Sequence, residues 1–212
     1  YHEIGDFRQA LDNHRLCIAN MTDSEIHWLT ARALNGIGQA LARLDRTQEA
    51  LDSHHRSLAI FREIDHAMGE ARVLDDIGTI YRGMGDFELA LPFHTKSLNL
   101  RRDIGQRRAE CTSLLNIARV HVGLSNPEAA MPVIDEAFAL AGETGSRPHV
   151  YDAHELYAEA FELQGDFEKA LHHCREFQRT REEVLGSDAN ERIRKLQIGF
   201  QVQEAEKDAE IE

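Results

Sequence analysis

Apolar residues recur along this chain at spacings of three and four, as they do along one face of an α-helix. Ile77, Ile80, Tyr81 and Met84 show the spacing clearly. The pattern stops at short polar stretches and then resumes, so it predicts a series of amphipathic helices joined by tight turns. Ala, Leu, Glu, Arg and Gln, all good helix formers, dominate the composition. We therefore expect an all-α fold.

The pattern repeats every 40 residues, which marks a repeat protein rather than a single globular core. Pairs made of an apolar and then a small residue recur at this period, and so does a series of alanines. The pairs are Ile37-Gly38, Ile77-Gly78, Ile117-Ala118 and Tyr157-Ala158, and the alanines are Ala10, Ala50, Ala90, Ala130 and Ala170. Because small side chains let a second helix approach closely, each repeat predicts two antiparallel helices.

A small residue also follows each alanine by seven positions, except in the last repeat, where Phe177 stands instead. Turn residues separate the two helices of each repeat, with Gly to end one helix in a left-handed conformation and Asp or Asn to cap the next. These turns are Gly5-Asp6, Asp45-Arg46, Gly85-Asp86, Ser125-Asn126-Pro127 and Gly165-Asp166. Asp45 therefore replaces the usual glycine in one of them.

The repeat resembles the tetratricopeptide repeat, whose usual period is 34 residues. The longer period is similar to that of G-protein-regulator adaptors and of bacterial peptide-sensing regulators. The resemblance implies a superhelical solenoid of antiparallel helix hairpins with a C-terminal capping or coiled-coil helix. We expect a repeat array over 1–185, with a partial repeat over 1–26 and full repeats over about 27–66, 67–106, 107–146 and 147–185.

The segment 188–212 reads as one more helix, and two interpretations of it stay open: a solvated cap, or a dimerising signalling helix. It resembles the helix that joins tetratricopeptide repeats to diguanylate cyclase, nucleotide cyclase or histidine kinase domains in bacterial signalling proteins. Its apolar stripes, which we take as dimerisation residues, are Ile193, Leu196 and Phe200, and Ile198 and Val202. Since Tyr1 aligns with Tyr81, late in a helix, we also expect the chain to be part of a longer protein.

Charge and composition exclude several classes of function. With 37 acidic and 24 basic residues the formal net charge is −13, which disfavours nucleic acid as a partner. No apolar run approaches the ~18 residues of a membrane span, so we expect no membrane insertion. The three cysteines are widely spaced without a CxxC motif, which is typical of reduced thiols and indicates a cytoplasmic protein.

The sequence offers few candidate residues for catalysis or metal binding. His14, His54 and His94 are 40 residues apart, and equivalent positions in successive repeats are too distant to share one metal ion. We interpret them as packing positions. Since no motif of a nucleophile, a phosphate loop or a zinc enzyme is present, we predict no catalysis, no cofactor and no metal.

What remains is the concave groove that the resemblance places along the first helix of each repeat. Its inward positions are basic at the start and acidic at the end, which fits a peptide with an acidic and a basic stretch; ordinary solvated charges are the alternative. These positions carry Arg32, Asn35, Arg43, Arg72, Asp75, Arg82, Asn116, Arg119, Glu155 and Glu159.

From these features we expect a regulatory or sensory protein–protein interaction module of a bacterial signalling protein. It would dimerise and control an output domain. The alternatives are an adaptor that binds a partner peptide in its groove and a purely structural oligomerisation domain.

Overall fold

The computed structural model describes residues 27–186, and these residues form α-helices without a strand. The helices are uniform in length and follow one another through short turns. They are α2 (His27–Arg43), α3 (Thr47–Glu63), α4 (Ala67–Met84), α5 (Phe87–Asp103), α6 (Arg107–Gly123), α7 (Pro127–Glu143) and α8 (Arg147–Leu163), with a further helix over 167–186. The predicted all-α architecture is confirmed.

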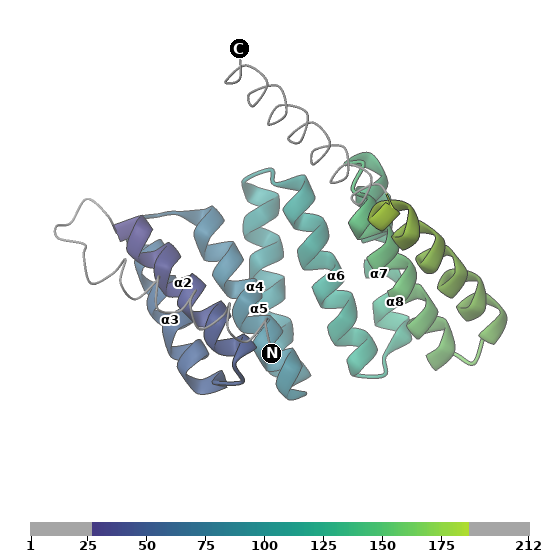
Figure 1. Ribbon diagram of the computed structural model, residues 1–212, viewed down its shortest axis with the longest axis horizontal. Helices are drawn as coiled ribbons and strands as arrows, with labels where there is room; N and C mark the ends of the chain where they lie inside the picture. The colour runs from purple at the N-terminus through teal and green to yellow at the C-terminus, as the bar shows by residue number, and fades with distance from the viewer. Residues whose placement is uncertain (1–26, 187–212) are drawn as a thin grey trace, which may run out of the picture.

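Consecutive helices form hairpins that stack side by side in chain order (Figure 1). The first helices of successive hairpins also touch: α2 contacts α4, α4 contacts α6, and α6 contacts α8. Among the described helices, no such contact joins α3 to α5 or α5 to α7. The stack therefore curves toward the first helices, which line its concave side, and the molecule is a solenoid of the tetratricopeptide type.

A residue with a positive φ angle follows each of the helices α2 to α8, and these residues lie 20 positions apart. Glycine occupies four of the sites, at residues 85, 105, 145 and 165. Asp45, Asp65 and Ser125 occupy the other three, with φ angles of 58°, 51° and 52°. After the left-handed residue the next amide bonds back to the helix, as Asp86 N does to the Tyr81 carbonyl at 2.9 Å. The 40-residue repeat is thus two near-equal halves.

Glycines and histidines fill the space inside the hairpins α2–α3 and α4–α5. The rings of His54 and His94 are 1 % and 0 % exposed and lie against Gly38 and Gly78. The packing role predicted for these histidines is confirmed. One helical turn farther on, the Ser57 hydroxyl donates a hydrogen bond to the Ala31 carbonyl at 2.7 Å.

Residues at the positions of Ala31 and Ser57 also contact each other in the later repeats, but through different chemical groups. The hydrogen bond itself recurs as Ala71–Ser97, again at 2.7 Å. In the third repeat the thiol of Cys111 donates instead to the Ala137 carbonyl at 3.2 Å. In the fourth repeat the pair is Tyr151 and Phe177, whose rings meet edge to face at 5.9 Å. Phe177 therefore breaks the small-residue rule because its partner position is enlarged as well.

Candidate functional site

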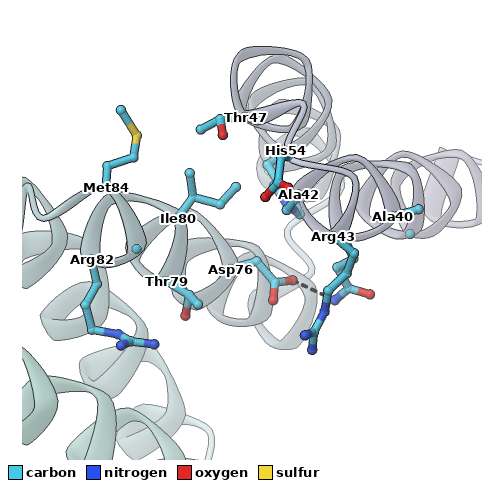
Figure 2. Close-up of a pocket in the computed structure, with 14 residues that line it drawn as sticks. Ala40, Ala42, Arg43, Thr47, His54, Asp76, Thr79, Ile80, Arg82 and Met84 are labelled. Atoms are coloured by element: carbon cyan, nitrogen blue, oxygen red, sulfur yellow. Dashed lines mark hydrogen bonds between the residues drawn. The ribbon is translucent and has the colours of Figure 1, made fainter. Parts of the chain in front are cut away.

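A groove runs along the junction of α2 and α4 on the concave side. At the C-terminal halves of the two helices it widens to a cavity of about 830 Å³. Figure 2 shows that Arg43, Thr79 and Arg82 point to one side of this cavity, while Ile80 and Met84 point to the other. One wall is therefore polar and the other apolar.

The groove continues toward the N-terminal halves of α2 and α4 as a second cavity of about 470 Å³. Gly36 and Gln39 border both cavities, so the two cavities adjoin there and form one hollow. Trp28, Arg32 and Arg72 line the second cavity. An extended segment lying in this hollow would run along the two helices.

Polar contacts to Asp76 of α4 join the two helices where the cavities adjoin. Asn35 Nδ2 and Gln39 Nε2, both on α2, donate to Asp76 Oδ2 at 2.9 Å each. Burial raises the pKa of Asp76, and these two hydrogen bonds oppose that rise. The Asn35 side-chain oxygen in turn accepts from His54 Nδ1 at 2.8 Å. Asp76 could not be recognised as a groove residue from the sequence, because its partners lie a full repeat away.

His54 is neutral in this arrangement. Burial, followed by the neighbouring His55, lowers the pKa of His54 to about 4. A neutral ring with its proton on Nδ1 satisfies the Asn35 oxygen, and Asn35 keeps its amide group for Asp76. The groove wall is therefore fixed by a chain of hydrogen bonds that begins inside the hairpin.

Farther along the concave side, charged groups of α4, α6 and α8 come within electrostatic reach of each other. Burial lowers the pKa of Arg82, the nearby Arg119 lowers it further, and Glu159 raises it. Partial desolvation and then Glu155 raise the pKa of Glu159, while Arg119 and Arg82 lower it. Arg119 also lies 3.4 Å from an Asp152 carboxylate oxygen. A basic strip on α4 and α6 thus faces an acidic one on α8.

The structure places the ten predicted groove residues in three groups. Arg32, Arg43, Arg72 and Glu159 are exposed, and Arg82, Asn116, Arg119 and Glu155 are half-buried. Asn35 and Asp75 are each only 6 % exposed. Asn35 still borders the smaller cavity.

Asp75 was predicted to face the groove, but its carboxylate is bound by other side chains inside the stack. It lies 2.7 Å from His94 Nδ1 and 2.6 Å from Arg101 Nη1, and it accepts from the Ser113 hydroxyl at 3.1 Å. Arg101 is buried as well and belongs to α5. Asp75 therefore ties α4, α5 and α6 together as a structural residue.

Arginines on the two sides of the solenoid differ in their partners. Arg62 and Arg102 pair with Glu70 and Glu110 at 2.7 and 3.0 Å across successive hairpins. Arg32, Arg72 and Arg82, by contrast, have no carboxylate within 4.0 Å in the part of the chain that the structure describes. The Nε atom of Arg82 is buried and has no hydrogen-bond partner among residues 27–186. These three arginines of the concave side thus keep donors available.

Other predicted features can be placed only in part. The dimerisation residues between Ile193 and Val202 lie outside the described residues. Across residues 27–186 no three His, Cys, Asp or Glu side chains converge as a metal site would require. None of the helices in the same range is long and apolar enough to cross a bilayer.

Two family models match the sequence, and both describe the tetratricopeptide repeat. One covers residues 29–103 and the other residues 115–182, together about two thirds of the chain. No curated protein gives a significant match to the sequence.

Solved structures resemble the fold at low sequence identity. BtubC (BKLC) from P. vanneervenii superposes with a TM-score of 0.75 at 16 % identity, over 87 % of this chain and 77 % of its own. The apo form of RapI gives 0.75 at 16 % identity, over 87 % and 67 %. A Rap protein complexed with competence and sporulation factor gives 0.69 at 13 %, over 85 % and 53 %.

At these identities the structural likeness speaks for the fold alone. The family models, the 40-residue hairpins and the curved stack agree with one another. The chain belongs to the tetratricopeptide-repeat family.

Proposed function

We propose that this chain is a non-catalytic regulatory module that holds an extended peptide of a partner protein in its concave groove. The observation that carries the proposal is the charge of that face. In a chain with a net charge of −13, Arg72 and Arg82 stay without carboxylate partners among the described residues, and both border the groove.

The charge pattern indicates the kind of peptide. Arg72, Arg82 and Arg119 would bind its acidic residues, since guanidinium groups pair with carboxylates through two parallel hydrogen bonds. Glu155 and Glu159 on α8 would receive basic residues. Partial desolvation raises the pKa of Glu159, and a cation at that place would lower it again by favouring the charged carboxylate.

Structural neighbours give independent support for a peptide as the ligand. Two of them are Rap proteins solved with competence and sporulation factor and, for the conjugation regulator of plasmid pLS20, with the Phr* peptide. The second superposes with a TM-score of 0.58 at 17 % identity. This chain spans 53 % and 48 % of those two proteins, so only the use of the repeat array is carried over to the proposal.

Charge reversal on the concave face tests the proposal. Nonapeptides selected on the wild-type protein from a random phage-displayed library serve as the probe, and calorimetry gives their Kd. We expect Arg82→Glu with Arg119→Glu to raise the Kd at least tenfold. Arg56→Glu on α3, an exposed arginine outside the groove, is the matched control. An equal Kd for all three proteins would remove the concave face as the binding site.

A signalling role with dimerisation is the finer part of the proposal, and the sequence of the last segment supports it. The stripes Ile193, Leu196 and Phe200, and Ile198 and Val202, would form the dimer contact. Light scattering of the chain with and without residues 188–212 tests this. A dimer that becomes a monomer on truncation is expected, and monomers in both cases would exclude it. The adaptor role does not depend on this result.

A further inference from the structure

The smaller cavity of the groove has apolar walls that the charge pattern does not explain. Trp28 of α2 is 42 % exposed and Met68 of α4 is 49 % exposed, and both line it. Its volume of about 470 Å³ lies within the range of pockets that hold small ligands, about 300–1,000 Å³. Two large apolar side chains facing one cavity are suited to bury a third.

The floor of this cavity is closely packed and largely apolar. Phe61 is 3 % exposed, and its ring lies so close to Gly69 that a Cβ atom there would be 2.4 Å away. The His66 ring lies 5.3 Å from the Phe61 ring. His66 is held in place because its Nδ1 accepts a hydrogen bond from Gly69 N at 2.9 Å, which caps α4.

The same place one repeat later has a different chemistry. Arg101 stands where Phe61 stands, and Ala109 replaces Gly69. The Arg101 guanidinium donates to the Ala109 carbonyl at 2.6 Å and is only 7 % exposed. An apolar floor thus gives way to a buried charge. The apolar cavity is a property of the α2–α4 junction and not of the repeat in general.

Two arginines form the rim of the apolar cavity. The Arg32 guanidinium lies 4.9 Å above the centre of the Trp28 ring, which fixes it beside the opening. Arg72 approaches from α4 and is exposed. Since neither arginine has a carboxylate partner among the described residues, the rim has a net positive charge that a ligand carboxylate would neutralise.

We infer that this cavity is an anchor subsite for one large aromatic or aliphatic side chain of a peptide in which Asp or Glu stands next to that residue. The inference rests on the proposed function and adds to it the residue that fixes the peptide's register. The side chain lies between Trp28 and Met68 on the Phe61 ring, and the neighbouring carboxylate meets Arg32 and Arg72.

The chain has a single tryptophan, and it is Trp28, so its fluorescence reports on the subsite directly. The probes are tryptophan-free nonapeptides selected from the random library on the wild-type protein. We expect them to share a large apolar residue beside Asp or Glu and to change Trp28 emission on titration. Replacing that apolar residue by Ala, or the acidic one by Lys, should raise the Kd about tenfold or more.

Protein variants complete the test. Met68→Glu places a carboxylate on the cavity wall at an already exposed position, so folding is retained, and we expect a Kd at least tenfold higher. Arg56→Glu on α3 should leave the Kd and the emission change unaltered. Selected peptides that lack the motif, leave Trp28 emission unchanged or bind Met68→Glu normally would overturn the subsite.

The outcomes separate the subsite from the proposed function. Binding that is lost with Arg82→Glu and Arg119→Glu but is indifferent to Met68→Glu leaves the groove as the site and overturns the anchor. Peptides whose binding responds to neither set of variants, or a library that yields no binder, overturn both.

Discussion

The imidazole ring of His54 lies directly against Gly38, so closely that a Cβ atom at residue 38 would be 2.6 Å from the ring. His94 and Gly78 repeat this contact, with a corresponding distance of 2.8 Å. The glycine on the first helix and the histidine on the second are therefore one packing unit. They set how closely the two helices of a hairpin approach.

Gly38→Ala should destabilise the protein although it replaces glycine in a helix. The methyl group would push the buried His54 ring away, at a cost of about 1–3 kcal/mol, which exceeds the ~1 kcal/mol gained in helix propensity. Gly142→Ala is the matched control, because a Cβ atom there meets nothing within 4 Å, and we expect it to stabilise. Urea unfolding measures both, and a stabilising Gly38→Ala would contradict the contact.

The left-handed turn residues give a second prediction. Asp65 has a φ angle of 51° where its counterpart Gly105 has 68°. Because glycine adopts this region without strain, Asp65→Gly should raise the free energy of unfolding by about 0.5–1 kcal/mol. The reverse change, Gly105→Asp, should lower it by a similar amount. Thermal unfolding measures both, and shifts of the same sign would show that the two turns are not equivalent.

Removing one partner from the buried charge network between α4, α5 and α6 should cost more stability than replacing the whole network by apolar residues. Asp75→Leu alone leaves Arg101 without its carboxylate and should cost about 3–5 kcal/mol. The third repeat carries Leu115 and Ile134 at the positions of Asp75 and His94. The apolar replacement of the whole set is therefore Asp75→Leu, His94→Ile, Arg101→Met and Ser113→Ala.

We expect that fourfold variant to unfold within about 2 kcal/mol of the wild type, because no charge is left buried without a partner. Urea unfolding of the single and fourfold variants makes the comparison. Should the fourfold variant be less stable than Asp75→Leu alone, the network would be a net stabilising element and this account of it would be wrong.

Stability should fall on acidification, partly through His54. Burial lowers the pKa of His54 from 6.5 to about 4, so the unfolded chain binds this proton first. Above pH 6.5 this histidine does not lower the stability. Between pH 6.5 and 4 the free energy of unfolding falls, and the loss is about 2 kcal/mol at pH 5. His54→Gln should weaken the pH dependence of the unfolding free energy by about one proton in that window. An unchanged slope would place the proton elsewhere.

Periodic features could be predicted from the sequence, because the residues that produce them recur in several repeats. The hairpins, the turns and the packing role of His54 and His94 all recur at 40 residues. What could not be predicted arises where one repeat differs from the others. Asp75 was expected in the groove, but Arg101, which has no counterpart in the first or third repeat, draws its carboxylate inside.

The candidate site could likewise be predicted only in part. Arginines could be assigned to the concave side from their register in the first helices. Their lack of ion pairs could not, since it depends on where the acidic residues of neighbouring hairpins lie. The apolar cavity was missed because Trp28, Phe61 and Met68 come from three helices and look like ordinary core residues in the sequence.

Amide chemical-shift mapping can show directly whether a peptide binds on the concave face. A selected nonapeptide is titrated into the isotope-labelled protein, and the shifted amides are assigned. We expect shifts concentrated on α2 and α4, extending to α6 and α8, with α3, α5 and α7 little changed. Shifts concentrated on α3, α5 and α7 would contradict binding on the concave face.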